Sequence, residues 1–251
     1  MAFERELTSV HEWLDATDRI ALQHFAVNVP TEIKADGTPV TAADQAIERA
    51  LRNAIASAFP SDAIVGEEFG SSSGARRWII DPIDGTKSYA RGVPVFATLI
   101  ALEIDGSLVL GCVSAPALGA RWWATTGGGA FCNGRAIVVS SVSRIDEAHL
   151  CTGGVDWARG GLDGLVASVA RVRGFGDFWG HMLVAQGSMD VMVEFAPLEV
   201  WDVAAPRAIV LEAGGAVSSH AGDARAVEGP IVTTNGLLHE DVLRALGTGG
   251  A

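Results

Sequence analysis

Asp81 and Asp84 lie three residues apart, directly after a short apolar segment, and their types and spacing could support shared chemistry. We expect residues 77–80 to form a buried strand that stops at Pro82, because proline cannot donate a ladder hydrogen bond. The two carboxylates would then lie at the strand's exit, where they repel each other unless a cation lies between them. Hard divalent cations with oxygen ligands commonly fill that role. The pattern therefore predicts a metal site at this strand end.

Gly85 and Thr86 follow the second aspartate and offer backbone amides at the start of a predicted helix, where a phosphate is well held. Asp-Pro and Asp-Gly pairs are also ordinary turn sequences, so either pair alone has a purely structural explanation. The combination of metal and phosphate ligands in one short loop favours metal-assisted phosphoryl chemistry.

Two further acidic residues, Glu67 and Asp202, strengthen this interpretation. Glu67 comes at the end of a short predicted strand, residues 63–66. Asp202 opens a helix that we expect to close at Gly214. An aspartate at a helix start is most often an N-cap, so Asp202 could be a cap, a metal ligand, or both.

Three segments together resemble the signatures of the inositol monophosphatase family: residues 66–68, 81–86 and 201–205. Their order and spacing fit, and the resemblance extends over nearly the whole chain. It implies a layered α/β/α/β/α sandwich of the sugar-phosphatase type, Mg²⁺ dependence and hydrolysis of small phosphate monoesters. Within the family, the histidinol-phosphate phosphatases are the most similar group, on residues 67–70, 84–94, 113–118, 121–124, 176–178 and 235–239.

The resemblance also implies a role for particular residues. Two or three Mg²⁺ ions would be bound by four carboxylates and one backbone carbonyl, those of Glu67, Asp81, Asp84, Asp202 and Ile83. The hydroxyl of Thr86, paired with Asp44, would orient the attacking water, with Glu67 assisting. The residues implied to contact substrate are Asp84, Gly85, Thr86, Arg91, Asp177, Glu194 and Asp202.

Asp177 and Glu194 would form an acidic wall suited to histidinol phosphate, whose imidazole and amine make it cationic near neutral pH. A turn or a helix N-cap is the alternative explanation for Asp177. Solvated charge is the alternative for Arg91, and we expect Asp190 and Glu199 to be surface charges.

Composition limits the class of protein. The chain has 251 residues and a formal net charge of −12, which argues against nucleic-acid or anionic-membrane partners because both need basic surface. Three cysteines show no metal-type spacing, and the N-terminal residues show no signal-peptide pattern. We therefore expect a cytoplasmic protein with no membrane segment, and the family resemblance implies a homodimer.

Periodicity predicts an alternating α/β chain. Expected helices cover residues 7–25, 41–58, 161–171, 178–187, 202–213 and 237–246, and expected strands cover residues 63–66, 77–81, 95–104, 107–115, 122–125, 136–139, 147–152, 189–195 and 230–234. Thr41 should cap the second helix, with Asp44 as its capping-box partner. A polar, turn-rich segment near residues 140–144 suggests an N-terminal α+β half, residues 1–140, and a C-terminal α/β half, residues 141–251.

Three functions fit these observations. The first is Mg²⁺-dependent hydrolysis of histidinol phosphate to histidinol by a metal-activated water, a step of histidine biosynthesis. The second is a phosphatase of the same family that acts on inositol 1-phosphate or broadly on sugar phosphates. The third is a non-catalytic protein that senses Mg²⁺ or phosphate. The third is disfavoured because all four acidic ligand positions, Thr86 and Asp44 are intact.

Overall fold

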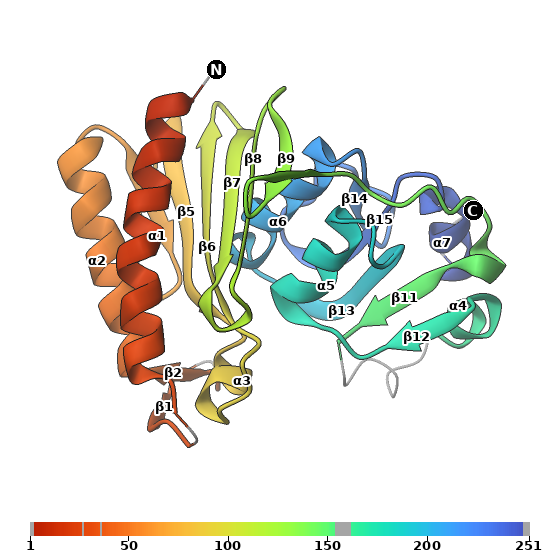
Figure 1. Cartoon of the computed structure of the whole chain (residues 1–251), viewed down its shortest axis with the longest axis horizontal. Coiled ribbons are helices and arrows are strands. Elements are labelled where there is room, and N and C mark those ends of the chain that lie inside the picture. The colour runs from red at the N-terminus through yellow and green to blue at the C-terminus, as the bar shows by residue number, and fades with distance from the viewer. Residues whose placement is uncertain (1–2, 27, 36, 154–161, 248–251) are drawn as a thin grey trace.

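The computed structural model describes residues 3–26, 28–35, 37–153 and 162–247. Figure 1 shows five layers in succession: two long helices, an eight-stranded sheet, a helical layer, a five-stranded sheet and a last pair of helices. The expected α/β/α/β/α sandwich is therefore what these residues form. None of the described helices combines the length and the apolar character needed to cross a bilayer.

The first layer consists of α1 (Glu4–His24) and α2 (Ala42–Ala58). Thr41 caps α2, and its own amide donates to Oδ2 of Asp44 at 2.9 Å, so the expected capping box is present. The buried face of α2, which includes Ile47 and Leu51, packs in one cluster with Trp78 and Ile80 of the sheet. This packing fixes Asp44 at the end of α2 that faces the phosphate loop.

The eight-stranded sheet has the order β10-β9-β8-β7-β6-β5-β3-β4. Its strands are β3 (Ala63–Gly66), β4 (Gly70–Ser71), β5 (Arg76–Asp84), β6 (Ala97–Ile104), β7 (Ser107–Ala115), β8 (Ala120–Thr125), β9 (Gly129–Cys132) and β10 (Arg135–Ile137). The other elements of this half are the hairpin β1 (Thr31–Ile33) and β2 (Pro39–Thr41), the short helix α3 (Thr86–Ala90) and a 3₁₀ turn at Pro116–Leu118. The sequence prediction missed β1, β2, β4 and β9.

The expectation that the central strand stops at Pro82 is wrong. Strand β5 continues to Asp84, although its pairing with β6 shifts register between Asp81 and Asp84. The parallel neighbour β3 ends opposite Ile80, so proline's missing donor costs no ladder bond on that side. Thr98 of β6 donates its hydroxyl to the Pro82 carbonyl at 2.8 Å instead. The irregular segment carries both aspartates.

The five-stranded sheet has the order β12-β11-β13-β15-β14. Its strands are β11 (His149–Thr152), β12 (Arg171–Arg173), β13 (Val191–Leu198), β14 (Ala216–Ser219) and β15 (Gly229–Thr234). The helices of this half are α4 (Asp163–Ser168), α5 (Asp177–Ala185), α6 (Val200–Glu212) and α7 (His239–Ala245), with a 3₁₀ turn at Ile145–Glu147. The two larger sheets fall on either side of residue 140, and a division into halves 1–140 and 141–251 stays a prediction.

Two local expectations in this half need correction. The helix predicted over 161–171 is shorter, because β12 occupies its end, and residue 161 lies outside the described residues. Asp190 is buried rather than exposed, since its carboxylate accepts bonds from the Ser140 hydroxyl and from the His149 amide. A turn-forming aspartate between two elements resembles a surface charge in sequence, and only tertiary structure reveals those donors.

The sequence analysis expected Asp202 to open its helix. Helix α6 begins at Val200 instead, so Asp202 is its third residue. Glu199 is the N-cap, and its amide donates to Oδ2 of Asp202 at 2.7 Å. The helix packs directly on β7: a Cβ at Gly111 would lie 2.5 Å from the Ala205 carbonyl oxygen. Close packing at this glycine therefore sets how near Asp202 comes to the first sheet.

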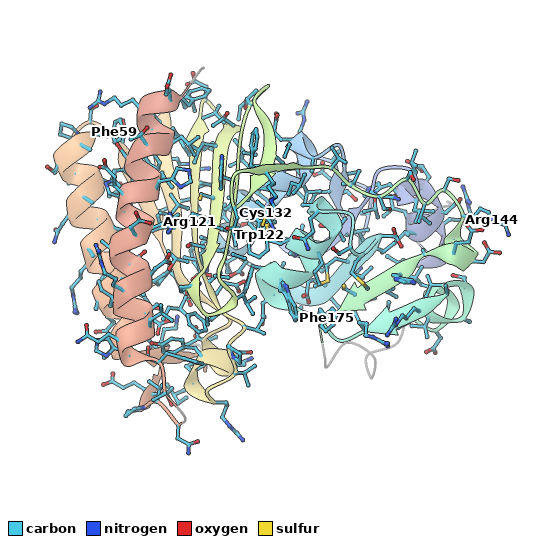
Figure 2. The ribbon with its side chains drawn as sticks, viewed as in Figure 1. Phe59, Arg121, Trp122, Cys132, Arg144 and Phe175 are labelled. Carbon is cyan, nitrogen blue, oxygen red and sulfur yellow. The ribbon has the colours of Figure 1, made fainter. Side chains whose placement is uncertain are left out.

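A second contact joins the helical layer to the same sheet. Trp122 of β8 lies between the sheet and α5 (Figure 2), and its indole N–H donates to Gln186 at 3.0 Å. Its ring is 6.3 Å from that of Phe178 at the start of α5. The elements that carry Asp202 and Asp177 are thus both packed against the sheet that carries Asp81 and Asp84.

Substituting Gly111→Ala should destabilise the fold by about 1–3 kcal/mol, because the added methyl overlaps backbone of α6. The same change should lower activity by displacing Asp202. Gly174→Ala is the matched control, since a Cβ there meets no atom within 4 Å. Urea unfolding of both variants checks this; equal stability of the two would contradict the packing argument.

Candidate metal and phosphate site

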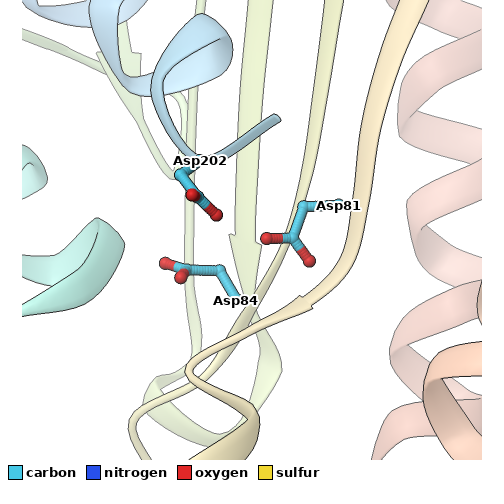
Figure 3. A group of neighbouring side chains, drawn as sticks. All are labelled: Asp81, Asp84 and Asp202. Carbon is cyan, nitrogen blue, oxygen red and sulfur yellow. The ribbon is translucent and has the colours of Figure 1, made fainter. Parts of the chain in front are cut away.

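Asp81, Asp84 and Asp202 converge at the junction of the first sheet and α6 (Figure 3). One carboxylate oxygen from each lies within 4.8 Å of the others. The first two come from the irregular end of β5 and the third from the first turn of α6. Residues far apart in sequence thus form one cluster of carboxylate oxygens, and its role as a metal site stays a prediction.

Burial makes this cluster costly without a cation. It raises the pKa of Asp81 and Asp84 well above their ordinary value, and neighbouring carboxylates add to the shift. Burial also raises the pKa of Asp202, to about 7. Oδ1 of Asp81 is buried and has no hydrogen-bond partner among the described residues. An orphaned buried carboxylate oxygen beside two more carboxylates is a donor set that fits a hard divalent cation.

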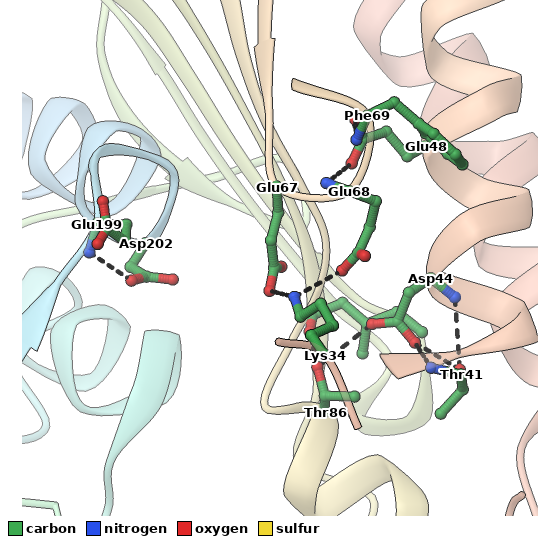
Figure 4. Close-up of polar contacts among 11 residues, drawn as sticks. Lys34, Thr41, Asp44, Glu48, Glu67, Glu68, Phe69, Thr86, Glu199 and Asp202 are labelled. Carbon is green, nitrogen blue, oxygen red and sulfur yellow. Dashed lines mark hydrogen bonds and ion pairs between the residues drawn. The ribbon is translucent and has the colours of Figure 1, made fainter. Parts of the chain in front are cut away.

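Glu67 lies beside this cluster and is paired with a lysine that the sequence analysis did not single out. Nζ of Lys34 is 2.6 Å from Oε1 of Glu67 and 3.0 Å from Oε1 of Glu68 (Figure 4). The lysine follows β1 in the hairpin that leads to α2. Burial raises the pKa of Glu67, and the charge of Asp44 adds to the shift, whereas Lys34 opposes it. The sequence did contain a signal for this pairing: Glu67 and Glu68 are adjacent, and two neighbouring carboxylates need a positively charged partner.

Glu48 of α2 holds the loop that presents Glu67. Its buried carboxylate accepts the amides of Glu68, at 2.7 Å, and Phe69, at 3.1 Å. A Cβ at Gly66 would lie 2.3 Å from Oε1 of Glu48, so only glycine fits where β3 ends. This carboxylate is a positioning group that sequence reasoning also missed.

Asp44 and Thr86 meet as predicted. The Thr86 hydroxyl lies 3.3 Å from Oδ1 of Asp44 and 2.9 Å from the Ile83 carbonyl oxygen (Figure 4). Oδ2 of Asp44 is held by the amide and hydroxyl of Thr41, so its other oxygen faces Thr86. Burial raises the pKa of Asp44.

Gly85 provides the turn between β5 and α3. Its φ of +83° favours glycine, and a Cβ would lie 2.9 Å from the Val95 carbonyl oxygen. The same Cβ position is 3.5 Å from Oδ2 of Asp177, which shows how closely the acidic residue of α5 approaches the phosphate loop.

Asp177 and Glu194 form one wall of a cavity of about 170 Å³. Asp84 and Asp202 line the same cavity, so the expected substrate wall and two expected metal ligands face a common space. Asp177 is the first residue of α5 and has a φ of +54°, whereas the N-cap is Gly176. Arg91 is exposed at the end of α3 and is not among the residues that line this cavity.

The raised pKa values predict a falling stability with pH in the metal-free protein. Folded carboxyls with raised pKa bind more protons than unfolded ones, so stability is lost as pH rises from about 4 to about 7, the pKa of Asp202. Mg²⁺ should restore it, and more at pH 8 than at pH 5. Thermal unfolding in EDTA and in Mg²⁺ measures this.

Asp202→Asn should flatten the fall of stability with pH in the metal-free protein, whereas Asp105→Asn, at an exposed position, should not. Equal pH dependence of the two variants would contradict the assignment.

Comparison with known proteins agrees with this geometry. Histidinol-phosphatase of Mycobacterium tuberculosis is 45% identical over 248 residues, covering 94% of this chain and 95% of that protein. Histidinol-phosphatase of Streptomyces coelicolor is 44% identical over 255 residues, covering 95% of each. Among solved structures, an IMPase of Thermotoga maritima superposes with a TM-score of 0.89 at 32% identity, covering 97% of both chains.

The model of the inositol monophosphatase family matches residues 10–249, which include every residue of the site described above. That match covers far more than half of the sequence, and the fold and the convergent acidic cluster agree with it. The chain belongs to the inositol monophosphatase family.

Proposed function

We propose that this protein is a Mg²⁺-dependent phosphatase whose substrate is histidinol phosphate and whose product is histidinol, in histidine biosynthesis. The observation that carries the proposal is the shared cavity: the acidic cluster opens into a space whose other wall is also acidic. Phosphatase chemistry follows from the family, and the histidinol-phosphatases identical at 44–45% support the substrate.

Glu67, Asp81, Asp84, Asp202 and the Ile83 carbonyl are the groups that would hold two or three Mg²⁺ ions. When bound, such ions lower the pKa of a coordinated water, neutralise phosphate charge and stabilise the leaving alkoxide. A positive charge already lies beside Glu67, because the ammonium of Lys34 is 2.6 Å from its carboxylate.

The chain's own groups orient the nucleophile. When Thr86 directs its hydroxyl proton to Asp44 and not to the nearer Ile83 carbonyl oxygen, it presents a lone pair that would accept a hydrogen bond from the attacking water. The water oxygen bonds to phosphorus as the ester P–O bond breaks. One proton of that water ends on the released alkoxide, so the products are the alcohol and inorganic phosphate. Gly85 and Thr86 amides at the start of α3 would hold phosphate oxygens. No covalent phospho-enzyme is needed.

Asp177 and Glu194 favour an alcohol that carries positive charge. Histidinol phosphate supplies an amine and an imidazole with an ordinary pKa near 6.5. A substrate with a second phosphate would instead face two carboxylates. Inositol 1-phosphate is the alternative substrate, because the solved structures most similar in fold include inositol monophosphatases of Thermotoga maritima and Anabaena.

A homodimer is proposed on the family resemblance, and a cytoplasmic location on the composition of the chain. Light scattering coupled to gel filtration measures the first.

Phosphate release from histidinol phosphate, inositol 1-phosphate, fructose 1,6-bisphosphate and adenosine 3′,5′-bisphosphate tests the proposal. We expect Mg²⁺-dependent turnover with kcat/KM about a hundredfold higher for histidinol phosphate, roughly 2.7 kcal/mol of discrimination.

Asp84→Asn should abolish turnover of all four substrates. Asp177→Asn should lower kcat/KM for histidinol phosphate about tenfold and change that for inositol 1-phosphate little, since it removes one charge from the wall. Equal rates on inositol 1-phosphate would overturn the substrate assignment, and no turnover would overturn the enzyme.

A further inference from the structure

A second cavity, of about 310 Å³, adjoins the acidic one and shares Asp177 and Glu194 with it. Oδ2 of Asp177 lies 3.5 Å from the Cβ position of Gly85, so this second space lies close to a phosphate held at Gly85 and Thr86. Its volume lies at the lower end of ligand pockets, roughly 300–1,000 Å³. The residues that line it are Ser88, Val93, Val95, Gly153, Gly174, Phe175, Gly176, Asp177, Trp179 and Glu194.

One side of this cavity is aromatic. The rings of Phe175 and Trp179 lie 4.6 Å apart with their planes tilted by 44°. Phe175 lies beside the start of α5 (Figure 2), and Trp179 lies in that helix's first turn. Val93 and Val95, from the segment after α3, provide an apolar surface contributed by the other half of the chain.

The charges of the lining are all of one sign. Among the described residues, the lining contains two carboxylates and no lysine, arginine or histidine. A carboxylate pair alone would accept any amine of suitable size, whereas aromatic and apolar walls beside it favour a flat cationic ring. Aromatic faces attract such a ring through dispersion and through their quadrupole.

We propose that this cavity is a subsite for a protonated heteroaromatic ring, with Trp179 and Phe175 as the residues that select the ring. Asp177 and Glu194 bind the positive charge of the ligand, and the aromatic pair distinguishes a ring from an aliphatic chain. The inference rests on the proposed function and deepens it, because it assigns ring recognition to residues outside the metal and phosphate site.

The test compares histidinol phosphate with the phosphate ester of 2-amino-1-pentanol, which keeps the amine and has no ring. In Trp179→Leu, kcat/KM for histidinol phosphate should fall about tenfold or more, mainly through a higher KM, since one aromatic contact to a cation contributes on the order of 1–2 kcal/mol. For the ringless ester, kcat/KM should change less than threefold. Trp179→Phe should restore most of the loss.

Trp123→Leu is the matched control, because Trp123 stacks on Phe131 and is not among the residues lining this cavity. This variant should leave kcat/KM for both substrates unchanged. An equal fall for both substrates in Trp179→Leu, or a fall confined to kcat, would overturn ring recognition. Should that variant unfold, Phe175→Leu provides the same comparison, with the same two outcomes.

Calorimetric titration with histidinol separates this inference from the proposed function. Wild-type protein should bind histidinol more tightly than 2-amino-1-pentanol, and Trp179→Leu should reduce the difference. That result would support the subsite even where histidinol phosphate is not hydrolysed, in which case only the proposed reaction fails. Equal binding of the two alcohols by wild-type protein would overturn the subsite whatever the enzyme turns over.

Discussion

Repulsion among one buried and two half-buried carboxylates is the constraint on which the rest of this structure depends. One carboxylate oxygen from each of Asp81, Asp84 and Asp202 lies within 4.8 Å of the others. Burial raises the pKa of all three carboxyl groups. Such a cluster is unfavourable in the folded chain unless a cation offsets it. The surrounding fold must therefore hold the acids together against their own charge. Rigid neighbours rather than flexible loops do so: a central strand, a capped helix and the glycine contact between them.

Three of the acids are positioned by neighbours that themselves perform no chemistry in our proposal. The amide of Glu199 holds Asp202, Thr41 holds Asp44, and Glu48 holds the loop that presents Glu67. The first two contacts are local to a helix start, whereas the Glu48 contact joins α2 to the first sheet. The packing of α6 on β7 at Gly111 then brings Asp202 to that sheet. The same layering puts the acidic wall on α5 and β13, opposite the phosphate loop, where it can act on the alcohol part of a substrate.

Much of this could be predicted from the sequence, because the acidic residues occur in compact local patterns. The buried strand that carries Asp81, the Thr41 capping box and the convergence of Asp84 with Asp202 all follow from local signals and from the family resemblance. Lys34, Glu48 and the buried state of Asp190 could not be predicted, since each depends on a partner distant in the chain. The continuation of β5 past Pro82 was missed because the ladder bond that proline lacks is not needed where β3 has ended. Helix α6 begins before Asp202 because Glu199 provides the cap.

The most direct test of the account is anomalous X-ray diffraction from crystals of the protein soaked in Mn²⁺, a scattering substitute for Mg²⁺. The account predicts strong anomalous peaks within coordination distance of Asp81, Asp84 and Asp202, and their loss in Asp84→Asn crystals grown in the same form. Absence of a peak at these carboxylates in the wild-type protein, with Mn²⁺ present at millimolar concentration, would contradict the claim that the cluster exists to bind a divalent cation.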